Sequence, residues 1–227
     1  LKEIAHAAEI PLVVKIGGCE AIRDLLDCKD LRIANIVAPM VESRYAAFKF
    51  VQSLERVYTK KEFRPNSYIN VETKQSFQNI QEISNEIKGK LTGVVMGRVD
   101  YVGSLGITRK NVNSEKVLND ALALSSICKE SNLDFVLGGG ISIDAIFFLR
   151  KVKEINLTRF ETRKCVFDSN TLEHPNVKNA LRNAVLFELL WLKSKQSYNS
   201  LITDEDNFRI EMLEQRHLYN TNSCSQL

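Results

Sequence analysis

The stretch that decides the fold runs from Ser67 to Gly106 and reads SYINVETKQSFQNIQEISNEIKGKLTGVVMGRVDYVGSLG. It contains two apolar runs typical of strands, joined by a run with helical spacing. Each strand run ends at a carboxylate, Glu72 for the first and Asp100 for the second. In a strand–helix–strand unit with parallel strands, both C-terminal ends open on the same side of the sheet. Carboxylate oxygens are the ligands that hard cations such as Mg²⁺ prefer. The stretch therefore predicts a divalent-cation site held by Glu72 and Asp100.

The alternation of strand and helix continues along the 227-residue chain. Strand-like runs are expected at residues 12–16, 33–37, 67–72, 93–100, 135–137 and 159–167. These runs are apolar almost throughout, which is typical of parallel strands that are covered on both faces. A (β/α)₈ barrel and a doubly wound sheet both have this pattern.

The favoured fold is a TIM-type (β/α)₈ barrel with C-terminal helices. Residues with useful chemistry end several successive strands, which is where barrel enzymes place their active sites. These residues are Lys15, Glu72, Asp100 and Arg163. Because only six strand-like runs are visible, we expect the barrel to lack at least one N-terminal strand in this chain.

The chain is expected to divide into a barrel core at 1–168 and a helical extension at 169–227. Within the extension, residues 177–195 and 204–218 have the spacing of amphipathic helices. The apolar group around Trp191, with Phe187 and Leu190, predicts a helix seam against the barrel or a neighbouring subunit. A homo-oligomer is therefore expected.

Composition excludes several classes of protein. Basic and acidic residues number 31 and 28 and are closely mixed, which gives no argument for a nucleic-acid partner. No run approaches the roughly 20 apolar residues of a membrane span, so no membrane partner is expected. The five cysteines are an odd number without CxxC spacing, which is typical of reduced thiols in a cytoplasmic protein.

Four segments carry a resemblance to a known family: PLVVKIGG, IVAPMVES, INVETKQSFQNIQEI and VVMGRVDYVGSLG. Together they resemble the aldolase/citrate lyase family of metal-dependent pyruvate and phosphoenolpyruvate barrels, which includes class II aldolases of 2-oxo acids and the citrate lyase beta chain. The resemblance covers roughly Pro11 to Gly106. It implies that Glu72 and Asp100 bind Mg²⁺ or Mn²⁺, which stabilises the enolate of a 2-oxo acid.

The chain departs from the family pattern at cationic positions. Lys15 stands where the family commonly has an arginine. A lysine provides a point charge, whereas an arginine can bind a carboxylate through two parallel hydrogen bonds. Lys15 is expected either to contact substrate or to form an ion pair with one of the carboxylates. Arg98 adds a cation that could bind the substrate carboxylate. Both are candidate catalytic residues, and the proton-transfer step has no assigned histidine.

Five further residues are candidates for substrate binding: Gly103, Ser104, Leu105, Glu42 and Arg163. The first three could present backbone N–H groups to a carboxylate, or form a tight turn. Glu42 could contact a substrate hydroxyl or cap the following helix. Glu161 and Arg163 alternate onto one side of the last strand, facing either the site or each other as an ion pair.

The resulting hypothesis is a metal-dependent carbon–carbon lyase of the aldolase type that acts on a small 2-oxo acid. The alternatives are a CoA-thioester lyase of the citrate lyase beta type, with an acyl substrate, and a non-catalytic barrel that binds a small acid.

Overall fold

A single curled sheet organises the protein, and the computed structural model describes residues 2–198 and 204–222. The sheet has seven strands in the order of the sequence. They are β1 Val13–Lys15, β2 Asn35–Ala38, β3 Asn66–Val71, β4 Gly93–Gly97, β5 Asp134–Gly138, β6 Arg159–Glu161 and β7 Val166–Asp168. The first six are parallel, and β7 is antiparallel to β6.

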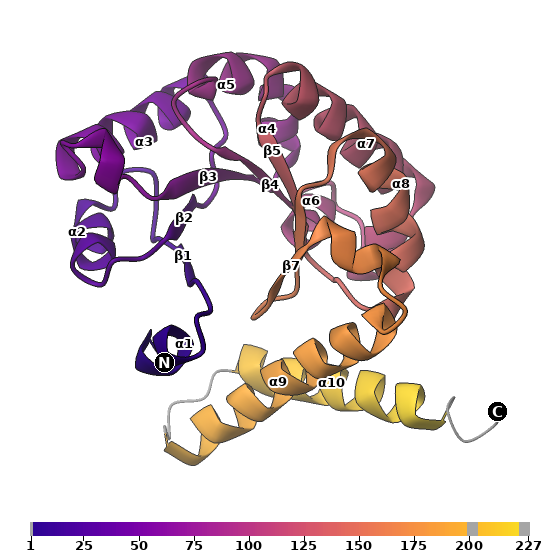
Figure 1. Cartoon of the computed structure of the whole chain (residues 1–227). Coiled ribbons are helices and arrows are strands. Elements are labelled where there is room, and N and C mark those ends of the chain that lie inside the picture. Colours follow the sequence, from indigo (N-terminus) through magenta and orange to yellow (C-terminus); the bar gives the residue numbers. More distant parts are fainter. Residues whose placement is uncertain (1, 199–203, 223–227) are drawn as a thin grey trace.

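Helices cover the outside of this curl, as Figure 1 shows. The main ones are α2 Ile22–Asp30, α3 Arg44–Val57, α5 Ile80–Ile87, α7 Glu115–Glu130 and α8 Ile146–Asn156. Shorter helices are α1 Lys2–Ala7, α4 Lys74–Gln78 and α6 Arg98–Ser104, with 3₁₀ turns at η1 Lys61–Phe63, η2 Arg109–Asn113, η3 Ile143–Ala145 and η4 Ser169–Glu173. The result is an α/β half-barrel. A complete (β/α)₈ barrel is not formed by the described residues, so the expectation of that barrel is confirmed only in part.

Both faces of the strands are buried, which explains why the strand sequences do not alternate between polar and apolar residues. Outward-facing side chains such as Ile36, Ile69 and Phe135 join the main core beneath the helices. Inward-facing Tyr68 packs in a second, smaller cluster with Val37, Val95 and Val136. Full burial of one such side chain stabilises the fold by about 1.5–3 kcal/mol.

Side-chain caps fix the points where the chain turns from strand to helix. Ser43 caps α3, as its hydroxyl accepts a hydrogen bond from Ala46 N at 3.1 Å. Thr73, directly after β3, forms a reciprocal capping box with Ser76 at the start of α4. An N-terminal cap of this type contributes about 1 kcal/mol. The cap after β3 also fixes the chain next to Glu72.

The strand expected at 159–167 is wrong, because this segment is a hairpin. Its turn is closed by Thr162, whose N–H donates to Cys165 O at 2.9 Å and whose hydroxyl accepts from Cys165 N at 3.1 Å. Across the two strands, Phe160 and Phe167 stack with ring centroids 5.2 Å apart. The strand expected at 93–100 also ends early, at Gly97, and α6 begins at the next residue.

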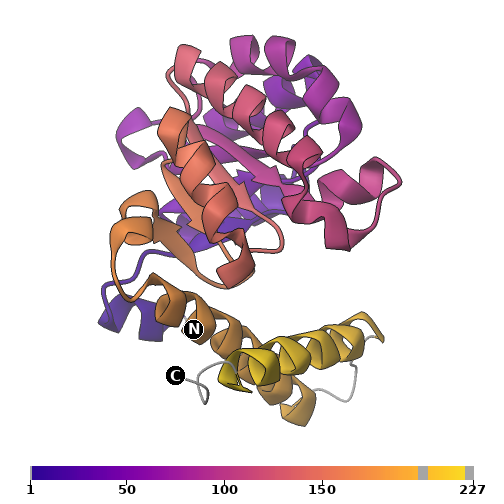
Figure 2. The same cartoon turned by 90° about the vertical axis from the view of Figure 1, so that its right-hand side faces the viewer.

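The C-terminal helices α9 Val177–Tyr198 and α10 Asp204–Asn222 pack on each other to one side of the half-barrel (Figure 2). Their shared cluster contains Val185, Leu189, Leu192, Ile210 and Leu213. Trp191 keeps 38% of its surface exposed, and Phe187 and Leu190 keep 44% and 56%. Among the described helices, none is long and apolar enough to cross a membrane.

Candidate active site

Glu72 is the centre of the site and lies at the C-terminal end of β3, only 1% exposed. Its Oε1 accepts a hydrogen bond from Met40 N at 3.0 Å, and its Oε2 accepts one from Asn70 Nδ2 at 2.8 Å. Met40 has a φ of 52°, in the left-handed region that few non-glycine residues adopt. The turn after β2 is therefore held in an unusual conformation that aims an amide at the carboxylate.

Two neighbouring glycines leave room for two carboxylates at this end of the sheet. Gly97 on β4 and Gly138 on β5 are register partners. A Cβ at Gly97 would lie 2.9 Å from Glu72 Oε2, and a Cβ at Gly138 would lie 3.0 Å from Glu161 Oε1. Glu72 from β3 thus lies against Gly97, and Glu161 from β6 lies against Gly138, at the C-terminal ends of β4 and β5. We call this region around the two glycines the glycine gap.

Asp100 lies beside Glu72, in the first turn of α6. Burial, the negative charge of Glu72 and a hydrogen bond to Glu72 together raise the pKa of Asp100, against the opposing charges of Lys15 and Arg109. Two carboxylates this close repel each other unless a proton or a cation lies between them. Glu72 and Asp100, the predicted metal ligands, are therefore brought together.

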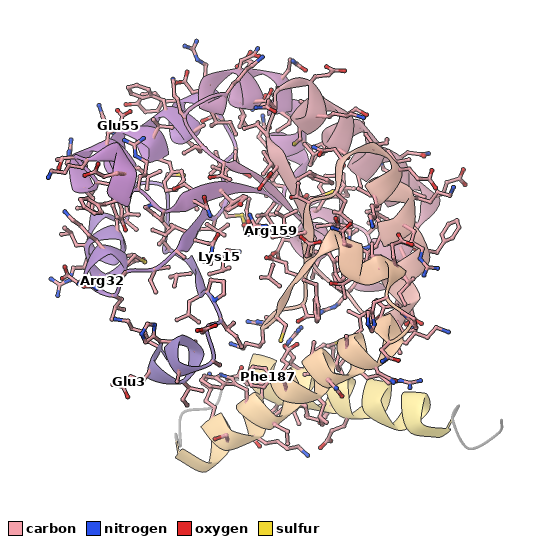
Figure 3. All side chains as sticks on the ribbon, viewed as in Figure 1. Glu3, Lys15, Arg32, Glu55, Arg159 and Phe187 are labelled. Carbon is pink, nitrogen blue, oxygen red and sulfur yellow. The ribbon has the colours of Figure 1, made fainter. Side chains whose placement is uncertain are left out.

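Lys15, the last residue of β1, supplies positive charge to this group. Its Nζ lies 3.2 Å from Glu72 Oε2, while half of its side chain remains exposed. Figure 3 shows Lys15 pointing into the space enclosed by the curled sheet. The ion pair left open by the sequence is thus present, and half of the Lys15 side chain stays exposed.

Glu161 completes the acidic group. Burial raises its pKa to about 7, with Lys15 and Arg159 opposing the shift and Glu72 adding to it. Glu72, Asp100 and Glu161 therefore form one acidic group, opposed by Lys15 and, at Asp100 and Glu161 respectively, by Arg109 and Arg159.

The opposite end of the barrel interior is closed by a polar network. Arg159 lies 3.3 Å from Asp134 Oδ2 and 3.4 Å from Asn35 Oδ1, and its guanidinium lies over the ring of Tyr68. Asn35, Asp134 and Arg159 are the first residues of β2, β5 and β6. These contacts fill the N-terminal end of the barrel interior.

Arg98 does not join this group. Its side chain is fully buried and donates to Gly138 O, Gly139 O, Val112 O and Asn113 Oδ1 at 2.7–3.2 Å. It also lies over the ring of Phe148, 4.5 Å from its centroid. Burial lowers the pKa of Arg98 to about 9. Its donors are used to hold the loop after β5 against α6, and they are not directed to a substrate.

The segment Gly103–Leu105 is the last turn of α6 and the residue after it, in place of an open loop. Leu105 N donates to Tyr101 O and Val102 O at 3.2 Å, and the hydroxyl of Ser104 accepts from Lys74 N at 2.7 Å. Gly103 lies within the helix. Helix formation from Arg98 onward engages these groups, so the structure does not present them as a carboxylate cradle.

Glu42 and Arg163 lie at the edges of the region. Glu42 is exposed, and its carboxylate accepts a hydrogen bond from the Thr73 hydroxyl at 2.7 Å. Ser43, its neighbour, provides the helix cap instead. Arg163 lies in the turn between β6 and β7, beside α9, and does not pair with Glu161. The hairpin removes the strand alternation on which their pairing depended.

Sequence reasoning missed two contributors to the site, Asn70 and the Met40 amide. Asn70 could have been found, since it precedes Glu72 by two residues and therefore faces the same side of β3. The Met40 amide had no such signal, because any residue supplies a backbone N–H.

The half-barrel with an acidic group at the C-terminal strand ends has the architecture of the phosphoenolpyruvate/pyruvate barrel class. Residues 2–154 match the family model described as HpcH/HpaI aldolase/citrate lyase. The chain belongs to the HpcH/HpaI aldolase/citrate lyase family, a family of lyases. A comparison with curated proteins gave no match.

Solved structures with the same fold include three bacterial proteins. An HpcH/HpaI aldolase from Desulfitobacterium hafniense DCB-2 is 12% identical, with 79% of this chain and 74% of that chain covered at a TM-score of 0.57. A citrate lyase from Burkholderia xenovorans LB400 is 13% identical, with coverages of 93% and 73% and a TM-score of 0.56. RipC from Yersinia pestis is 16% identical, with 78% of each chain covered and a TM-score of 0.55.

The family generally depends on a divalent metal ion. The question is then whether the carboxylates at the glycine gap can bind such an ion. Among the described residues, no group of three or more His, Cys, Asp or Glu side chains is arranged to hold a metal ion. Mg²⁺, however, keeps several waters and is often held by one or two carboxylates together with substrate oxygens. Glu72 and Asp100 fit that mode of binding.

Proposed function

We propose that this chain is a metal-dependent carbon–carbon lyase of the aldolase type that acts on a 2-oxo acid. The observation that carries the proposal is the convergence of Glu72, Asp100, Glu161 and Lys15 on the glycine gap, at the C-terminal ends of parallel strands. Enzymes of barrel architecture place their catalytic groups at this end.

Glu72 and Asp100 would hold Mg²⁺ or Mn²⁺. When bound, the ion supplies Lewis-acid stabilisation of the enolate that forms as the carbon–carbon bond breaks. Hydrogen bonds from Met40 N and Asn70 Nδ2 orient the Glu72 carboxylate before substrate arrives. Such preorganisation matters because no side chain then needs to rearrange as charge develops.

Lys15 and Glu161 have the remaining roles in the proposal. The half-exposed Lys15 side chain would provide positive charge for the substrate carboxylate. Glu161 faces the same gap from the opposite strand and is not one of the two ligands. Its position allows it to exchange a proton with the reacting carbon or the leaving oxygen.

Oxaloacetate decarboxylation tests this proposal, because it proceeds through the same type of enolate. We expect Mg²⁺- or Mn²⁺-dependent turnover by the wild type and its loss in Glu72→Gln. Glu82→Gln removes an exposed carboxylate from α5 and is the matched control, with activity unchanged. Equal rates for wild type and Glu72→Gln would contradict the proposal. Binding of metal and oxalate without turnover of any 2-oxo acid would indicate the non-catalytic acid-binding barrel instead.

A further inference from the structure

A hollow lies between the β6–β7 turn and the C-terminal helices. It has a volume of about 450 Å³ and is lined by Arg163, Lys164, Glu188, Trp191, Leu192, Ser194, Lys195 and Asp206. Figure 1 shows the hairpin that ends in β7 reaching from the sheet toward α9. We call this hollow the hairpin groove. Its volume is within the range of small-ligand sites, about 300–1,000 Å³.

Positive charge is in excess in the hairpin groove. Lys195 is paired with Asp206 at 2.7 Å, and Arg209 is paired with Glu188. No hydrogen bond or ion pair joins Arg163 to the other described residues, and Lys164 contacts only an aromatic ring among them. Neither cation forms an ion pair within 4 Å with a carboxylate of the described residues, although the charge of Glu188 acts on Lys164. Burial lowers the pKa of Lys164, and the charges of Arg163, Lys195 and Arg209 add to this effect against Glu188.

An aromatic surface forms one wall of the same groove. Lys164 Nζ lies 5.4 Å from the centroid of the Trp191 ring, and 38% of Trp191 remains exposed. A partly exposed indole favours stacking with a flat ring such as a nucleobase. The groove therefore combines a stacking surface with two cations that form no ion pair.

We propose that the hairpin groove binds a phosphorylated ligand that carries a flat ring, with the chemistry of a nucleoside monophosphate. Arg163 and Lys164 bind the phosphate, and the ring stacks on Trp191 in the place that the Lys164 ammonium leaves as it turns to the phosphate. The two unpaired cations match the two negative charges of a phosphate monoester. The arginine fork fits phosphate oxygens better than a single point charge does. This site is separate from the proposed lyase chemistry and does not depend on it.

Trp191 is the only tryptophan of the chain, so its fluorescence reports on this groove alone. Metal-free protein is titrated with AMP, with adenosine and with inorganic phosphate. We expect saturable quenching by AMP, and binding at least tenfold weaker for adenosine and for phosphate. Equal affinity for AMP and phosphate would overturn the role of the ring. Equal affinity for AMP and adenosine would overturn the role of the cations.

Two variants complete the test. Arg163→Ala removes an exposed side chain in a turn and should weaken AMP binding by about tenfold or more, because a hydrogen bond between charged groups is lost. Lys60→Ala is the matched control and should leave AMP binding unchanged. Lys60 also lies over an aromatic ring, 5.9 Å from the centroid of Phe63, but it does not line the hairpin groove. An unchanged affinity in Arg163→Ala, or no response of Trp191 to AMP, would overturn the proposal. Metal-dependent decarboxylation is measured on the same variants. AMP binding at the hairpin groove is judged separately, because it does not depend on whether the chain decarboxylates oxaloacetate.

Discussion

Replacing Glu161 by glutamine tests the electrostatics of the glycine gap. Burial raises the pKa of Glu161 from the ordinary 4.5 to about 7. The folded chain therefore binds this proton more tightly than the unfolded chain does. Glu161 lowers the free energy of unfolding progressively as the pH rises through the window between those two values. At 1.36 kcal/mol per pKa unit, the whole shift corresponds to about 3 kcal/mol.

Urea unfolding at about pH 4.5 and about pH 8, with a chelator present, measures this effect. Near pH 4.5 the protonated wild type and Glu161→Gln should differ little, because the two side chains have similar shape and no charge. Near pH 8 the variant should be the more stable protein, by up to about 3 kcal/mol.

Glu86→Gln provides a control of opposite sign. Hydrogen bonds from Lys90 and Arg44 lower the pKa of Glu86, so its contribution to stability is present at neutral pH and is lost in acid. Glu86→Gln should therefore destabilise the protein at pH 8 more than at low pH. If Glu161→Gln brings no gain at pH 8, or the same gain at both values, the charge of Glu161 is not the cause and the reasoning is refuted.

Three further predictions follow from the same contacts. Asp100→Asn should abolish Mg²⁺ binding in isothermal titration while leaving the urea midpoint nearly unchanged, since the shape is kept and one negative charge is lost; retained affinity would count against the assignment. Arg98→Met should lower the free energy of unfolding by about 3 kcal/mol or more, because four buried acceptors lose their donor, and a loss of turnover without a loss of stability would restore a catalytic role to Arg98. Light scattering should show a homo-oligomer, given the exposed Phe187 and Leu190 on α9; a monomer at all concentrations would contradict that expectation.

The acidic pair was predictable because it depends on rules that hold for any parallel sheet. Glu72 follows a buried strand, and Asp100 follows the next strand along the chain. Neighbouring parallel strands end on the same side, whatever covers them. Lys15 ends β1, which is parallel to β3 but separated from it by β2, so it also lies on this side of the sheet and can pair with Glu72.

The expectations for Arg98 and for Gly103–Leu105 were wrong because both depended on where β4 ends. β4 ends at Gly97, three residues before the expected strand end at Asp100, and α6 follows directly where the sequence pattern indicated no helix. This change turns the guanidinium of Arg98 toward buried carbonyls and places Gly103–Leu105 at a helix end. Apolar periodicity does not fix such boundaries to the residue.

The hairpin at β6–β7 was missed for a similar reason. Apolar residues on both sides of Arg163 and Lys164 read as one strand, because the turn contains no glycine, proline or asparagine. Instead, the hydroxyl of Thr162 closes the turn. The position of Glu161 over Gly138 depends on register across β5 and β6, which a single sequence does not specify.

The central claim is that Glu72 and Asp100 jointly hold one divalent ion in the glycine gap. A crystal soaked with Mn²⁺ and oxalate tests it most directly through the anomalous signal of manganese. The account predicts one peak within about 2.0–2.3 Å of a carboxylate oxygen from each residue, with oxalate on the same ion. A peak bound elsewhere, or one bound to only one of these two carboxylates, would contradict it.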